Sequence, residues 1–111
     1  MCIILDHVKH NIYFLSTFYM EVYKSKAKKI GVEIKPSTNK AKKFDAYKDG
    51  VKQASFGATG YQDYEKYKKS DGLEVANKKR SAYRARHADD INIKTRDGKM
   101  TAGYLAGKIL W

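Results

Sequence analysis

The first 29 residues carry apolar side chains at the spacing of an amphipathic helix. Successive apolar positions lie three or four residues apart: Leu5, Val8, Ile12, Leu15, Tyr19 and Val22. Apolar residues at this spacing form one stripe along a helix. Asp6 near the start and four lysines near the end oppose the helix dipole. The pattern predicts a helix over residues 5–29, with a strand as the alternative because residues 12–15 are rich in strand formers.

The apolar face of this predicted helix is wide for so short a chain. Phe18 lies beside the stripe and widens it. A chain of 111 residues builds one small core, which cannot cover a face of this width. We therefore expect the face to dock on a larger protein, through Leu5, Val8, Ile12, Leu15, Phe18, Tyr19 and Val22.

Alternating apolar and polar residues around an Asp-Gly pair predict a β-hairpin over residues 44–56. A two-residue turn at Asp49-Gly50 would split the apolar side chains between the two faces of the hairpin. A three-residue loop with Gly50 in the left-handed conformation would instead pair Tyr47 with Val51. That register gathers four apolar residues on one face: Phe44, Ala46, Ala54 and Phe56. We expect the second register, because it gives the hairpin one continuous apolar face.

Turn-forming residues flank this hairpin. Residues 32–43 predict the end of a strand and then a basic turn around Pro36-Ser37-Thr38-Asn39. The sequence Gly57-Ala58-Thr59-Gly60 predicts a turn from strand to helix. A phosphate-binding loop is the alternative, but the Lys-Ser/Thr pair of that motif is missing.

The C-terminal half predicts mostly helix. Residues 61–69 and 73–88 predict two helices, and the second would face inward through Leu73, Ala76 and Tyr83. Residues 89–100 predict a loop with a turn at Asp97-Gly98. The final helix would begin after Thr101 as N-cap, and its two glycines, Gly103 and Gly107, predict close packing against a neighbour. The fold class is therefore α+β, with an N-terminal helix, one central β-hairpin and two to three C-terminal helices in a single small domain.

Charge and composition narrow the function. The chain has 23 Lys+Arg against 12 Asp+Glu, for a net charge of +11, and 13% of its residues are aromatic. The aromatic content argues against disorder. The positive excess is spread along the chain, which predicts a folded body whose field suits phosphates, an acidic protein or an anionic membrane surface. The alternative is that the lysines only keep the protein soluble. No apolar stretch approaches the roughly 20 residues of a membrane span, so we expect none.

Basic residues interleaved with tyrosines give the strongest indication of function. Cations contact phosphates, and tyrosine rings stack on bases. Arg80 and Arg84 are four residues apart on one predicted helix, and arginine binds phosphate through two hydrogen bonds. The candidate anion- or nucleic-acid-binding residues are Lys35, Lys40, Lys42, Lys43, Lys79, Arg80, Arg84, Arg86 and His87. The alternative is that the tyrosines pack the core and the charges are solvated.

Catalytic and metal chemistry find less support. His7 and His10 lie near the lone Cys2, but no fourth ligand has a suitable spacing. His87 precedes two aspartates, yet their arrangement matches no nuclease site. We therefore expect no enzyme activity, no metal or other cofactor and no small-molecule substrate.

Four sequence blocks occur in an order that resembles a known family. They are Lys35-Pro36-Ser37-Thr38 leading to Lys42-Lys43-Phe44, then residues 56–64, residues 80–87 and residues 101–111. Together they resemble a small uncharacterised family of basic proteins encoded by tailed phages and by nucleocytoplasmic large DNA viruses. The resemblance covers residues 35–111 and implies a viral setting, without an activity. It leaves residues 1–34 as an N-terminal helical extension, which we interpret as an assembly element.

These observations predict a small virion-associated structural protein. It would be a minor capsid, cement or connector-type component that binds a larger capsid protein, packaged double-stranded DNA or both. Its location would be the virion and, before assembly, the host cytoplasm. The alternative is a free nucleic-acid-binding module that acts in the infected cell.

Overall fold

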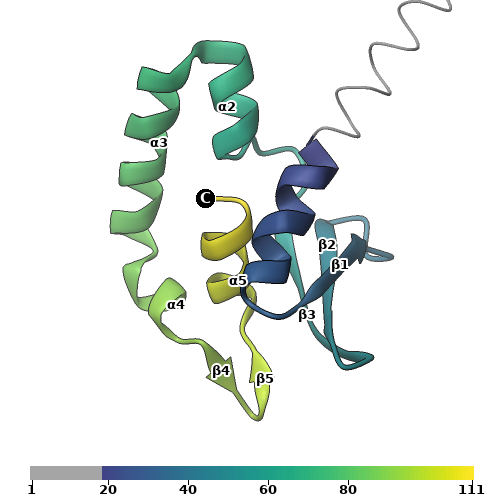
Figure 1. Ribbon diagram of the computed structural model, residues 1–111. Coiled ribbons are helices and arrows are strands. Elements are labelled where there is room, and N and C mark those ends of the chain that lie inside the picture. The colour runs from purple at the N-terminus through teal and green to yellow at the C-terminus, as the bar shows by residue number, and fades with distance from the viewer. Residues whose placement is uncertain (1–18) are drawn as a thin grey trace, which may run out of the picture.

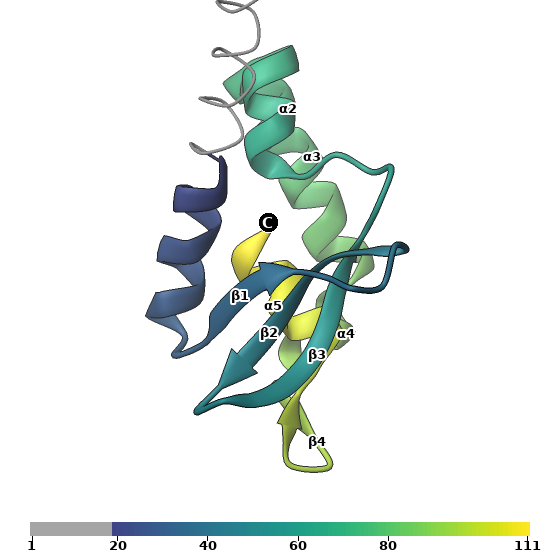
Figure 2. The ribbon, with the colours of Figure 1, turned by 90° about the vertical axis from the view of Figure 1, so that its right-hand side faces the viewer.

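A three-stranded antiparallel sheet forms one layer of the protein, and helices pack on one of its faces (Figures 1 and 2). The computed structural model describes residues 19–111. In chain order the elements are a helix at residues 19–29, β1 (Glu33–Pro36), β2 (Lys42–Lys48), β3 (Val51–Ala58), α2 (Tyr64–Asp71), α3 (Leu73–Arg86), α4 (Ala88–Asn92), β4 (Thr95–Arg96), β5 (Lys99–Met100) and α5 (Ala102–Ile109). The α+β class and the single small domain are confirmed. The predicted layout is wrong in two respects: four helices follow the sheet instead of two to three, and β1 adds a third strand to the predicted hairpin.

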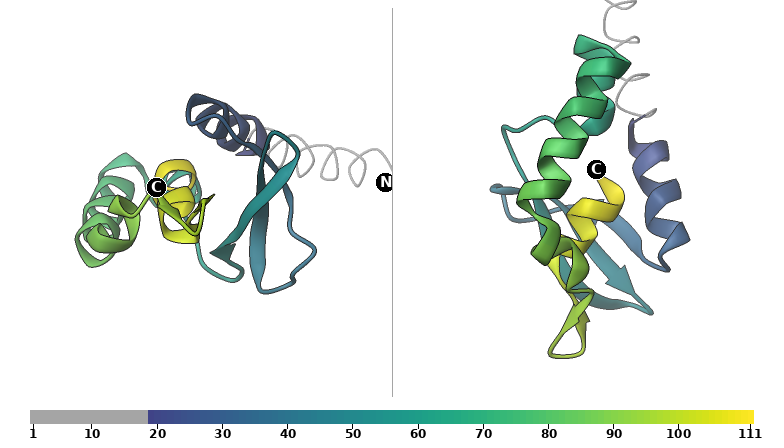
Figure 3. Two further views of the ribbon diagram at one scale, coloured as in Figure 1. Left: turned by 90° about the horizontal axis from the view of Figure 1, so that it is seen from below. Right: turned by 90° about the vertical axis from the view of Figure 1, so that its left-hand side faces the viewer.

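Helix α5 lies between the sheet and α3, and the helix of residues 19–29 lies beside it on the same face of the sheet (Figure 3). The core fills the space between these helices and the sheet. Its most deeply buried members include Phe56, Leu105 and Ile109, each 0% exposed. The short α5 therefore holds the layers together, and the chain that follows it lies close to α2 and α3.

The described part of the predicted N-terminal extension shares this core. Residues 19–29 are helical, as predicted, and Tyr23 and Ala27 are buried with Phe56 in one cluster. The predicted boundary between residues 34 and 35 falls inside β1. Of the predicted docking face, Leu5, Val8, Ile12, Leu15 and Phe18 lie outside the described residues. Tyr19 packs partly buried against the core, and Val22 is also half-buried.

The central hairpin has the predicted apolar face, but the predicted loop is wrong. Lys48 pairs with Val51, so the turn has two residues. Asp49 and Gly50 both have positive φ angles, of 51° and 78°, which is the conformation of a type I′ turn. This turn matches the right-handed twist of the two strands, which explains why it replaces the three-residue loop.

A β-bulge restores the apolar face. Ala46 pairs with Ala54 while Tyr47 pairs with Lys52, so Gln53 is the extra residue in β3. The side-chain oxygen of Gln53 accepts a hydrogen bond of 3.0 Å from the backbone N–H of Met100 in β5. The bulge therefore corrects the register and also ties the sheet to the second, two-stranded hairpin.

The chain between α3 and α5 is more ordered than the loop predicted for residues 89–100. It forms α4 and then the hairpin β4–β5, with a two-residue turn at Asp97-Gly98. The prediction for Leu73 is also wrong, because it is 54% exposed at the start of α3. Ala76, one turn later, is fully buried as predicted.

Helix α5 packs tightly on α4 through its glycines, as predicted. Thr101 caps α5 by accepting a hydrogen bond of 3.1 Å from the N–H of Tyr104. A Cβ atom on Gly107 would lie 2.6 Å from Cγ1 of Ile91, and one on Gly103 would lie 2.7 Å from Cβ of Asp90. Only glycine permits this approach, which sets the position of the chain end against α3.

Candidate nucleic-acid interface

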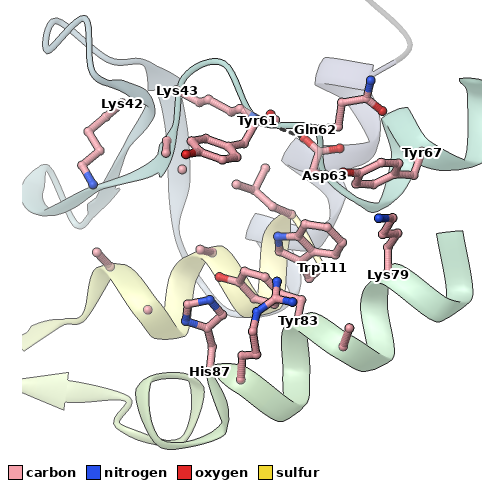
Figure 4. Close-up of a pocket in the computed structure, with 18 residues that line it drawn as sticks. Lys42, Lys43, Tyr61, Gln62, Asp63, Tyr67, Lys79, Tyr83, His87 and Trp111 are labelled. Carbon is pink, nitrogen blue, oxygen red and sulfur yellow. Dashed lines mark hydrogen bonds and ion pairs between the residues drawn. The ribbon is translucent and has the colours of Figure 1, made fainter.

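A cavity of about 590 Å³ opens between the β2–β3 hairpin and the start of α2 on one side and α3 and α5 on the other (Figure 4). We call it the cleft. Its aromatic lining consists of Tyr61, Tyr67, Tyr83 and Trp111, and its basic lining consists of Lys42, Lys43, Lys79, Arg86 and His87. Among the described residues, Asp63 is the one acid in the lining. The cleft thus joins rings and positive charges in one concave surface.

Three rings lie together along the α3 side of the cleft, and two of them are stacked. Tyr83 and Trp111 lie parallel, with ring centroids 4.5 Å apart and planes 10° apart. The ring of His87, at the C-terminal end of α3, is tilted by 32° to that of Tyr83, with ring centroids 4.4 Å apart. Burial, followed by the charge of Asp90, raises the pKa of the Tyr83 hydroxyl, so this residue stays neutral at physiological pH. The stack gives the cleft a rigid aromatic wall.

Asp63 holds the opposite side of the cleft in place. It caps α2 by accepting a hydrogen bond from the N–H of Lys66, and it accepts one of 2.6 Å from the hydroxyl of Tyr23. Its carboxylate lies 3.3 Å from Nζ of Lys43, whose ammonium also donates to the carbonyl of Tyr61 at 2.6 Å. Asp63 is only 1% exposed, so its negative charge is compensated inside the fold.

The pKa shifts of its two partners follow from burial. Burial, together with the hydrogen bond to Asp63, raises the pKa of Tyr23 and keeps its hydroxyl a donor. Burial lowers the pKa of Lys43, and the Asp63 carboxylate opposes that shift. Since Lys43 and Asp63 neutralise each other, the positive potential of the cleft comes from its other cations.

Three of those cations have no ion-pair partner within residues 19–111. They are Lys42 from β2 and Lys79 and Arg86 from α3. Nζ of Lys79 lies 5.4 Å from the centre of the Tyr67 ring, which places an exposed charge against an aromatic wall. Lys79 and Arg86 are seven residues apart, two helical turns, and therefore reach the same side of α3.

The structure brings together five of the nine predicted anion-binding residues, namely Lys42, Lys43, Lys79, Arg86 and His87. The guanidinium of Arg80 instead lies 3.4 Å from the centre of the Tyr64 ring. Arg84 donates a hydrogen bond of 3.1 Å to the main-chain oxygen of Trp111. Both arginines thus make contacts within the fold. Lys35 lies over the Tyr47 ring, and Lys40 is exposed in the turn after β1, both outside the cleft lining.

Two parts of the site were not predicted from the sequence. The Tyr23–Asp63 contact joins residues 40 positions apart, and nothing in their local sequence indicates that they meet. Trp111 appears in sequence only as the residue after an apolar helix, whereas in the fold it lies at the centre of the aromatic wall. The one signal in the sequence that could have indicated Trp111 is its residue type, because tryptophan, a large aromatic ring with a polar N–H, is frequent in binding sites.

Other sites have little support in the described structure. Residues 19–111 contain no group of three or more His, Cys, Asp or Glu side chains placed to hold a metal ion. Cys2, His7 and His10 lie outside this range. No helix in the same range is long and apolar enough to cross a membrane.

Comparison with known proteins gives one match. Residues 32–72 match a family of unknown function (DUF5754), which is less than half of the chain. The matched segment spans β1 to α2 and supplies one side of the cleft, including Lys42, Lys43, Tyr61 and Asp63. No curated protein and no solved structure matches the chain. The resemblance to a viral family stays a prediction, because this family description names no source.

Proposed function

We propose that this protein binds nucleic acid through the cleft, with Lys42, Lys79 and Arg86 contacting backbone phosphates. One observation carries the proposal: four aromatic rings and several cations share a cavity whose one acid is already neutralised by Lys43. Phosphates are attracted to unpaired cations, and bases stack on rings. An acidic protein surface would need the charges but not the rings, so nucleic acid matches the lining better.

The salt dependence of binding tests this proposal. Each phosphate contact contributes about 0.7 to the log–log slope of affinity against salt for single strands, and about 0.9 for duplex DNA. The double variant Lys79→Gln/Arg86→Gln should therefore lower the slope by about 1.4 for a single-stranded oligonucleotide. Glutamine keeps a high helix propensity, so α3 should stay folded.

A matched variant separates a local contact from a general charge effect. Lys28→Gln/Lys48→Gln removes the same charge from exposed positions outside the cleft lining. It should leave the slope nearly unchanged. Equal slopes for the two double variants would overturn the proposal. So would a parent protein that binds no oligonucleotide even at low salt, where phosphate contacts are strongest.

A virion-associated structural role is a second candidate. It is favoured by positive charge that extends well beyond the cleft, with exposed lysines on separate elements such as Lys28, Lys48, Lys69 and Lys108. Such a surface suits a protein placed between a capsid and packaged DNA. Mass spectrometry of purified particles of the encoding virus should detect the protein at a stoichiometric copy number. Its absence from the particles would leave only the nucleic-acid-binding role.

A further inference from the structure

The shape of the cleft limits what kind of nucleic acid can enter it. Its volume of about 590 Å³ lies within the range of pockets that enclose small ligands. Readout of an intact duplex needs a protruding helix or ribbon that enters a groove, whereas the rings here line a concavity. A paired base reaches such a pocket only after it leaves the stack, at a cost of a few kcal/mol.

Tyr61 faces the aromatic wall from the other side of the opening. Figure 4 shows its ring across the cavity from Tyr83 and His87. The residue is 74% exposed, the most exposed of the large apolar side chains in the described chain. Within residues 19–111 its ring stacks on no other aromatic ring. An exposed, unstacked tyrosine at the mouth of an aromatic cavity leaves its face free for a ligand.

The backbone of Tyr61 is nevertheless held. Its carbonyl accepts the 2.6 Å hydrogen bond from Lys43, and two residues later Asp63 is anchored to Tyr23. The exposed ring therefore extends from a fixed point, which lowers the entropy lost when a ligand stacks on it.

From these features we infer that the cleft takes a single unpaired nucleobase, between Tyr61 and the wall of Tyr83 and Trp111. The inference rests on the proposed function and names its ligand class: single-stranded nucleic acid, with the flanking phosphates on Lys42, Lys79 and Arg86. Duplex nucleic acid binds more weakly, because it presents phosphates but keeps its bases stacked. Recognition through ring faces is tolerant of base sequence.

Trp111 provides a probe inside the cleft, because it is the only tryptophan in the chain. Its fluorescence is measured in the full chain during titration with three DNA ligands of about eight nucleotides. They are oligothymidylate, an abasic strand of the same length, and a duplex of the same length. Oligothymidylate should quench the emission. The abasic strand should bind, as shown by anisotropy of an attached dye, without quenching it.

The variant Tyr61→Ala removes one side of the proposed sandwich. Loss of a stacking ring should weaken oligothymidylate binding about fivefold to a hundredfold and leave abasic-strand binding unchanged. Tyr47→Ala is the control, since it removes the same kind of ring from β2, at a position outside the cleft lining. It should bind both strands as the parent does.

The outcomes separate this inference from the proposed function. If the three ligands bind with equal affinity and equal effect on Trp111, the protein binds phosphates only, and the base pocket is wrong while the function stands. Equal weakening of both strands by Tyr61→Ala would likewise exclude the base pocket and leave the function in place. If none of the ligands binds, the proposed function itself is wrong.

Discussion

Replacing Asp63 by asparagine should weaken the fold and strengthen nucleic-acid binding. The change keeps the size of the side chain and removes its charge. Asp63 accepts a 2.6 Å hydrogen bond from Tyr23 and lies 3.3 Å from Nζ of Lys43, in a position that is 1% exposed. Asparagine can still cap α2, so the loss is confined to the charged contacts.

The expected size of the loss follows from those contacts. A hydrogen bond to a charged group contributes about 1.5–3 kcal/mol, against about 0.5–1.5 kcal/mol for a neutral pair. The difference, together with the lost partner of half-buried Lys43, gives a destabilisation of about 2 kcal/mol. For a domain of this size that lowers the melting temperature by about 10 °C.

Binding should change in the opposite direction. Without Asp63 the charge of Lys43 is no longer compensated in the cleft, so affinity for a single strand rises at low salt. The salt slope should rise by about 0.7, the value of one further phosphate contact. Urea unfolding followed by Trp111 fluorescence measures the stability, and oligonucleotide titrations at several salt concentrations measure the slope.

The variant Tyr23→Phe is the control for this experiment. It removes a hydrogen bond from the same carboxylate but changes no charge, so it should destabilise the protein and leave the salt slope unaltered. If Asp63→Asn binds more weakly than the parent, or melts at the same temperature, the assigned network does not govern the cleft.

Two further predictions concern packing and acid stability. Gly107→Ala should lower the free energy of unfolding, measured by urea unfolding, by about 1 kcal/mol, because the clash with Ile91 outweighs the gain in helix propensity. A variant more stable than the parent would contradict the α4–α5 packing. Hydrogen bonds from Ser37 and Ser55 lower the pKa of Asp45, so its stabilising contribution is present at neutral pH and is lost as the pH falls below about 4. At neutral pH the variant Asp45→Asn should melt at a lower temperature than the parent protein. Between a pH of about 6 and about 3 its melting temperature should fall less than that of the parent, which thermal melts across that range will check.

Periodic segments of the chain were predictable, and short ones were not. The helical spacing around Tyr19 and Val22 and the alternation around Phe44 and Phe56 are long enough to reveal their periods. Helix α4 has five residues and β4 and β5 have two each, which is too few for a period to show. Their order depends on tertiary contacts, such as the packing of Ile91 against α5.

The hairpin register shows a different limit. The two-residue turn follows from local Asp-Gly chemistry, but the bulge does not. Gln53 is the bulged residue, and its side chain binds the backbone of Met100, which is 47 positions away. A correct apolar face therefore came from a wrong loop. The two-residue turn and the bulge each shift the predicted pairing by one residue in the same direction, and a shift of two residues returns the same side chains to the same face.

The candidate site was predictable in its residue types and not in its geometry. Lysine and arginine near tyrosine indicated an anion site, and Lys79 and Arg86 do line the cleft. Which face of α3 meets solvent depends on its packing partners. Arg80 packs on Tyr64 of α2, and Arg84 contacts the main chain at Trp111, so the pair with helical spacing is not the pair in the cleft.

Binding of nucleic acid in the cleft can be located residue by residue with a chemical-shift titration. In ¹H–¹⁵N spectra of the full chain, a single-stranded oligonucleotide should shift the indole N–H of Trp111 and the backbone amides near Tyr61, Lys79 and Arg86. Amides near Val51 at the far hairpin turn should stay in place. Shifts that gather at β4–β5 or spread evenly over the exposed lysines, with the Trp111 indole unmoved, would show that nucleic acid does not bind in the cleft.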